Sequence, residues 1–175
     1  MAVGDIKVIK GAGPVVRYLA EDRGTSSVTS AMLPGEPVKV GGTGTNFVLP
    51  LVTGDPEVGT DEMVGIVYSE STETAAADGE VYVTTMFPVK TILQAKATTS
   101  SNVDTQAKID VLMGDWIALD VTGAGTNGPT GVFSFDENET TDPNVHGFKV
   151  VAGEPVRGTL NCMVHSMATQ AGTTV

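Results

Sequence analysis

Several residue types that support chemistry or anchoring are scarce in this sequence of 175 residues. Cys162 is the only cysteine, which excludes an internal disulfide and a cysteine-based metal cage. No apolar run approaches the roughly 20 residues of a membrane-spanning helix. The first residues contain no basic stretch followed by an apolar one, so we expect no signal peptide.

Positive charge is also in short supply. Ten Lys and Arg residues stand against 21 Asp and Glu residues, which gives a formal net charge of −11. The basic residues are scattered singly along the sequence, whereas nucleic acids and anionic membranes are bound by clusters of Lys and Arg. We therefore expect neither a nucleic acid nor a membrane as partner. The charge is typical of a soluble protein at high copy number, because like-charge repulsion prevents unwanted association.

Motifs of catalysis are missing from the sequence. There is no Gly-x-Ser-x-Gly elbow, no His-x-x-x-His pair and no glycine-rich phosphate loop followed by Lys-Ser/Thr. His146 and His165 have no acidic or cysteine partner at ligand spacing. Cys162 lies among apolar residues and is predicted to be a small buried side chain; on a strand, it and His165 would face opposite sides. We therefore predict that the protein is not an enzyme and uses no cofactor.

One acidic stretch is the candidate metal site, Asp136-Glu137-Asn138-Glu139-Thr140-Thr141-Asp142-Pro143. Several carboxylate and amide oxygens close together suit Ca²⁺. The EF-hand pattern fails, because the sixth position of the loop is not glycine and no helix flanks it. A solvated loop between strands is the main interpretation, a weak structural cation is the alternative, and we predict no metal.

What the sequence has in abundance favours strands and turns. Forty-eight residues are Val or Thr and 21 are Gly; β-branched residues pack well on a pleated sheet, and glycine suits tight turns. Apolar and polar residues alternate in short segments separated by turn residues. This predicts an all-β fold, an antiparallel sandwich or barrel-like domain, with or without a second small β lobe. The expected strands are 5–10, 15–20, 36–40, 47–52, 62–69, 80–86, 89–95, 107–113, 116–121, 131–135, 147–151 and 156–167.

The polar segment 98–102 is the best internal boundary, and it divides the chain into a lobe of residues 1–97 and a second lobe, or a continuation of the first, of residues 98–175. We expect it to be a hairpin tip that joins Ile92–Ala97 to Gln106–Met113, because both arms alternate small and polar residues. A linker between two lobes is the alternative for 98–102, and a short helical turn at 103–108 stays open. One helical turn at 71–78 is also open.

Trp116 is the one tryptophan. By alternation it shares a face with Ala118 and Asp120, while Ile117 and Leu119 share the other face. Two interpretations stay open. Trp116 belongs to the core, or it anchors an oligomer interface, where tryptophan is enriched.

A pattern of strands and turns in the first half resembles the head decoration (cement) proteins of tailed bacteriophages. Its parts are Met63-Val64-Gly65-Ile66-Val67-Tyr68, a polar loop, Gly79-Glu80-Val81-Tyr82-Val83 and Pro88, preceded by Gly35-Glu36-Pro37-Val38 to Val52. Two later segments, Asp115–Val121 and Gly153–Leu160, resemble phage structural proteins. The chain is longer than the smallest cement proteins, which suggests an added lobe after about residue 98.

The resemblance implies a capsid decoration protein, a homotrimer bound to the major capsid protein on the outer surface of an icosahedral head. It would be made in the host bacterial cytoplasm and would clamp neighbouring capsomers at threefold positions. The expected capsid contact is the segment 2–10, which would add a strand to a sheet edge on the capsid; the alternative is an ordinary edge strand of the protein's own fold. The contact residues are Val3, Asp5, Ile6, Lys7, Val8 and Ile9.

Two other function classes stay open. One is a different virion structural protein, a tail-tube or minor capsid subunit, which would polymerise alone or on a template. The other is a carbohydrate-binding or adhesin β module, for which the acidic loop at 136–142 is the one supporting feature.

Overall fold

The computed structural model describes residues 6–24, 30–41, 46–53, 63–87, 89–122, 132–139 and 147–165. These residues are mostly strand, which confirms the predicted all-β class. No helix within them is long or apolar enough to span a membrane. The strands are β1 (Lys7–Lys10), β2 (Ala12–Ala20), β3 (Pro37–Val40), β4 (Val48–Pro50), β5 (Met63–Ser69), β6 (Gly79–Met86), β7 (Ile92–Ala97), β8 (Trp116–Thr122), β9 (Val132–Asp136), β10 (Phe148–Glu154) and β11 (Thr159–Val164).

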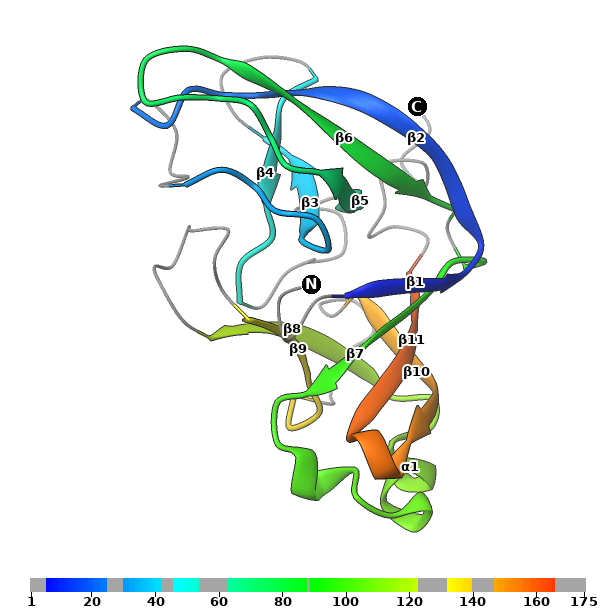
Figure 1. The fold of residues 1–175 in the computed structure, drawn as a ribbon. Helices are drawn as coiled ribbons and strands as arrows, with labels where there is room; N and C mark the ends of the chain where they lie inside the picture. The colour runs from blue at the N-terminus through cyan, green and yellow to red at the C-terminus, as the bar shows by residue number, and fades with distance from the viewer. Residues whose placement is uncertain are drawn as a thin grey trace.

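Five of these strands close into a small barrel in the lower half of Figure 1. Its strand order is β7-β11-β10-β8-β9, and β9 returns to pair with β7. The closing pair is parallel, with Lys96 opposite Ser134 and Ala97 opposite Phe135, whereas the other pairs are antiparallel. Because β9 covers the end of β7, β1 pairs with the first half of that same edge, with Lys7 opposite Gln94.

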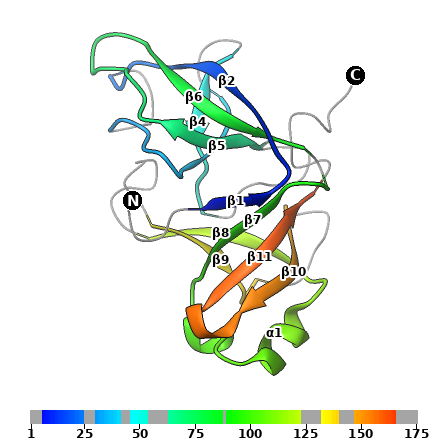
Figure 2. The ribbon, with the colours of Figure 1, turned by 45° about the vertical axis from the view of Figure 1, so that its right-hand side comes forward.

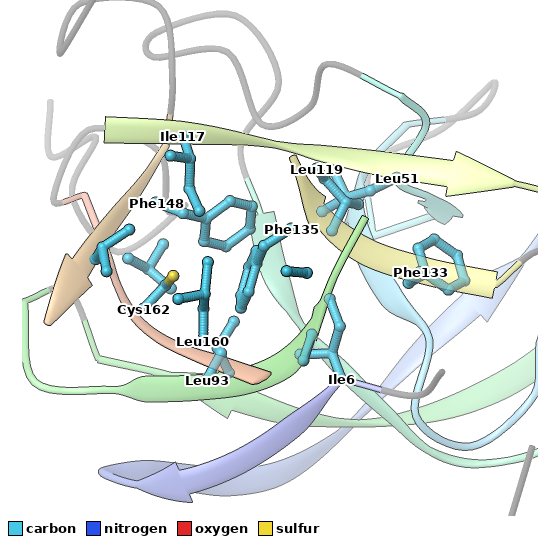
Figure 3. Close-up of a cluster of buried hydrophobic side chains, with 14 of the residues drawn as sticks. Ile6, Leu51, Leu93, Ile117, Leu119, Phe133, Phe135, Phe148, Leu160 and Cys162 are labelled. Carbon is cyan, nitrogen blue, oxygen red and sulfur yellow. The ribbon is translucent and has the colours of Figure 1, made fainter. Parts of the chain in front are cut away.

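Alternating side chains fill the barrel. On β7 and β11 the inward residues are Leu93, Ala95 and Ala97, and Leu160, Cys162 and Val164, all of them buried. Figure 3 shows Leu93, Leu160, Phe135 and Phe148 gathered inside, and the rings of Phe135 and Phe148 lie 5.1 Å apart. Burying each large apolar side chain contributes about 1.5–3 kcal/mol, so the barrel provides a rigid support for the side chains on its outer face.

The second sheet lies above the barrel in Figure 1 and has the order β2-β6-β5-β3-β4. One of its faces buries a separate cluster that includes Val38, Val67 and Val83. On its other face, Met63, Ile66 and Met86 pack in the barrel's own core cluster. Ile6 and Leu51 belong to the same cluster. The two sheets therefore share a hydrophobic core.

Two crossovers connect the sheets. Strand β1, which pairs with the barrel, continues through Gly11 into β2 of the second sheet. Strand β6 of the second sheet is followed, after residues 87–91, by β7 of the barrel (Figures 1 and 2). The change of sheet thus falls before β7, and β7 pairs with strands from the last third of the chain. The division at residue 98 stays a prediction about domains.

The expected hairpin between Ile92–Ala97 and Gln106–Met113 is wrong. Residues Gln106–Leu112 form the helix α1, after the 3-10 turn η1 (Ser100–Asn102). The Thr105 side chain caps the helix by accepting from the Lys108 backbone N–H, and Ile109 turns into the barrel core. Small alternating residues suit a strand only if a partner strand is available, and both edges of β7 are occupied. The 71–78 segment forms no helix.

Candidate binding face

Strand β1 contains most of the predicted capsid-contact residues. Val3 and Asp5 lie outside the described residues. Ile6 is only 2% exposed and belongs to the barrel core, and Val8 packs against the same core. Lys7 and Ile9 are exposed. In this structure β1 is an edge strand of its own sheet, and a contact between it and a capsid stays a prediction.

The outer face of β1, β7 and β11 carries three exposed lysines, and the amide and apolar side chains between them are partly buried. Since Leu93 and Cys162 point into the barrel, alternation places their strand neighbours outside. The pairing aligns Lys7, Gln94 and Asn161 in one row across the three strands. It aligns Lys10, Ile92 and Met163 in a second row. We call this surface the lysine face; it consists of Lys7, Lys10, Ile92, Gln94, Lys96, Asn161 and Met163.

A hydrogen bond confirms the orientation of this face. The Gln94 side chain donates from Nε2 to Oδ1 of Asn161 at 3.0 Å, so both amides lie on the same side of the sheet. The three lysines on the face form no ion pair with any described residue, and neither does Lys90 in the adjoining turn. Among the described residues, these four lysines therefore have no ion-pair partner, in a protein whose formal net charge is −11.

Trp116 lies at the start of β8, beyond the lysine face. It pairs with Lys149 of β10, and the Lys149 ammonium lies 5.6 Å from the centre of the indole ring. The ring of His165 meets it edge-on at 4.8 Å. Trp116 is half-buried and stays outside the core cluster, which Ile117 and Leu119 of the same strand enter. A role in an oligomer interface stays a prediction.

The environment of His165 lowers its basicity. Partial burial lowers the pKa of its imidazole below the ordinary value of 6.5, because the charged form loses solvation. Its backbone N–H donates to the Gly147 carbonyl at 2.8 Å, which fixes the end of β11 beside β10. The neutral ring therefore packs against Trp116 at neutral pH.

Cys162 is fully buried inside the barrel, as predicted. Burial raises the pKa of its thiol well above the ordinary value of 9.0, because the thiolate would lose solvation. It faces the core while His165 contacts Trp116 outside the barrel, so the two do not form a nucleophile pair.

The acidic loop has a structural use in its described part, residues 136–139. Glu137 is buried and accepts hydrogen bonds from the Thr99 backbone at 3.1 Å and the Asn102 amide at 3.0 Å. Asp136 accepts from the Asn138 backbone at 3.0 Å. Within the described part of the chain, no group of three or more His, Cys, Asp or Glu side chains is arranged to hold a metal.

Sequence reasoning missed the lysine face because its members are far apart in the chain. Lys7 and Gln94 are separated by 87 residues, and only the pairing of β1 with β7 makes them neighbours. The available signal was the alternation itself, which placed each lysine on the polar side of its strand. Only when the strand partners are known does this alternation show which lysines share a surface.

No protein-family model matches this chain, and no curated protein sequence matches it.

Proposed function

We propose that the protein is a capsid decoration protein, which binds the outside of an icosahedral phage head and stabilises the assembled shell. The observation that supports this best is the lysine face, on which exposed lysines surround partly buried amide and apolar side chains held on a closed barrel. A protein that acts by attachment needs such a surface on a rigid support. The resemblance of the Met63–Tyr68 and Gly79–Val83 strands to cement proteins supports the same proposal.

The stabilisation follows from mass action. A protein that binds only the expanded, assembled lattice stabilises that lattice by its binding free energy at every site. Interfaces of about 800 Å² per partner, repeated over the shell, add up although each is modest. In a trimer, three such surfaces would engage together, and avidity would keep the protein in place.

The test is to mix the purified protein with empty expanded heads that lack decoration and to image the particles. We expect extra density at threefold positions and a higher temperature of head disruption. Bare particles at saturating protein would contradict the proposal. Filaments formed by the protein alone would instead support a tail-tube subunit.

The contact is best tested with point variants. Deleting residues 2–10 would remove Ile6 and Val8 from the core and would confuse unfolding with lost binding. Lys7→Glu leaves those side chains in place, since Lys7 is exposed.

A further inference from the structure

Acidic residues are distributed unevenly along this chain, although the basic residues are scattered singly. None of the 21 acidic residues lies in the four segments 6–20, 81–103, 147–153 and 155–165. These segments contribute a formal charge of +7, and the rest of the chain contributes 3 − 21 = −18, which together give −11. The seven basic residues are Lys7, Lys10, Arg17, Lys90, Lys96, Lys149 and Arg157.

The fold gathers these segments. They supply β1, β7, β11 and most of β10, which are consecutive neighbours in the barrel sheet, and β2 with most of β6, which pair in the second sheet. Figures 1 and 2 show that β1 continues into β2 and that β6 leads to β7, so the two groups of strands adjoin at the crossovers. We call the surface of these segments the acid-free side, with the lysine face at its centre; Glu80 and Glu154 lie near the ends of β6 and β10, and Asp104 lines a pocket with Lys96 at its edge.

Ion pairs within the protein leave much of this positive charge available. Arg17 pairs with Glu80 at 2.7 Å and Arg157 with Glu154 at 3.3 Å, both at the border of the acid-free side. Lys7, Lys10, Lys90 and Lys96 form no ion pair with a described residue. The free ammonium groups therefore concentrate on the β1–β7 pair.

We propose that the acid-free side docks onto a protein surface that presents carboxylates. The inference deepens the proposed function and rests on it, because it names the chemistry of the shell surface that the protein would contact. Charge complementarity selects the partner, since a face whose own segments contain no carboxylates meets acidic groups with little like-charge repulsion. The acid-rich remainder would then face solvent and keep decorated particles apart.

Exposed apolar side chains favour a protein over a nucleic acid as the partner. Of the twelve large apolar side chains exposed among the described residues, seven lie in the acid-free segments. They are Ile9, Val15, Val16, Tyr82, Phe87, Val89 and Val156. Phosphate backbones are bound by dense Lys and Arg contacts, whereas apolar side chains between separate cations match the surface of a protein.

The binding chemistry is tested first with poly-L-glutamate, a soluble carboxylate polymer, by NMR titration of the ¹⁵N-labelled full-length protein at low ionic strength. We expect amide shifts confined to β1, β2, β6, β7, β10 and β11, which reverse on adding salt. An absence of shifts, or shifts spread evenly over the chain, would overturn the proposal. Equal or tighter binding of a DNA duplex by the same amides would overturn the choice of a protein partner.

The partner is tested with undecorated heads and two matched variants. Lys7→Glu/Lys10→Glu changes the charge by −4 on the acid-free side, and Lys39→Glu/Lys108→Glu makes the same change elsewhere. We expect the first variant to lose about tenfold or more in affinity for heads and the second to stay close to the wild type. Melting curves would verify that both variants fold.

The outcomes separate the two proposals. If the wild type binds heads and the Lys7→Glu/Lys10→Glu variant binds them equally, the inference fails and the proposed function stands. If the wild type ignores heads while poly-L-glutamate still shifts the acid-free strands, the proposed function fails and the carboxylate preference is supported.

Discussion

The side-chain hydroxyl of Thr91 donates a hydrogen bond of 2.6 Å to the backbone carbonyl of Gly11. The same hydroxyl accepts from the Phe87 backbone N–H at 2.8 Å. Thr91 is completely buried. The Thr91 side chain therefore links the two crossovers that connect the barrel to the second sheet, and it holds β1 beside β7.

Replacing Thr91 with valine should destabilise the protein. Valine has nearly the same shape, but it leaves the Gly11 carbonyl and the Phe87 N–H without their partner in a partly buried place. We expect a loss of about 1–3 kcal/mol in the free energy of unfolding, measured by urea denaturation. Thr85→Val is the control, because its hydroxyl makes one exposed bond, to the Pro14 carbonyl; an equal loss in both variants would contradict the argument.

The acidic loop offers a second test. Glu137→Ala should cost about 1–3 kcal/mol, because the Thr99 N–H and the Asn102 amide would lose their acceptor. Glu139→Ala, an exposed neighbour in the same loop, should stay within about 0.5 kcal/mol of the wild type. Thermal melting of both variants checks this. If Ca²⁺ stabilised the wild type and the Glu137→Ala variant lost that effect, the loop would be a cation site instead of a hydrogen-bond anchor.

The β class and most strands could be predicted because alternation is a local signal. The segments expected at 80–86 and 116–121, for example, correspond to β6 and β8. The segment at 106–112 shows where local reasoning ends. Its residues Gln106-Ala107-Lys108 alternate like a strand, but Thr105 caps a helix and Ile109 supplies the buried contact. Only the tertiary structure shows that β7 has no free edge for them.

The binding face needed more than local signals. Sequence reasoning placed Lys7 in a contact segment but treated the basic residues as scattered. Strand order is a property of the whole fold, so the row formed by Lys7, Gln94 and Asn161 could not be read from any one segment. Closure of the barrel through the parallel pair of β7 with β9 was likewise not foreseen.

Cys162 should be chemically inert in the native protein. Its thiol is buried and its pKa is raised well above 9.0, so both access and the reactive thiolate are lacking. At pH 8 we expect a thiol reagent such as DTNB to react slowly with the native protein and at once in guanidinium chloride. Because the folded state holds this proton more tightly than the unfolded state, stability should also fall as the pH rises above about 9. Rapid native labelling would show that the barrel opens readily.

His165 should make stability depend on pH at the acid side of neutrality. Its folded pKa is lowered from 6.5 by partial burial against its surroundings, which include Trp116. The unfolded chain therefore takes up the proton first as the pH falls, which lowers the free energy of the unfolded state relative to the folded state. The contribution of His165 to stability is complete above about 6.5 and is lost as the pH falls through the folded pKa.

The measurement compares the wild type with His165→Gln, so that the contribution of His146 cancels. Unfolding free energies between pH 7.5 and 5 should fall more steeply in the wild type than in the variant. The imidazole signal that disappears from the NMR spectrum of the variant should titrate below pH 6.5 in the wild type. Tryptophan fluorescence gives an independent reading, since protonation next to the indole of Trp116 should change its intensity over the same range. Titration of that signal at or above 6.5 would mean that the packing of His165 against Trp116 does not persist in solution.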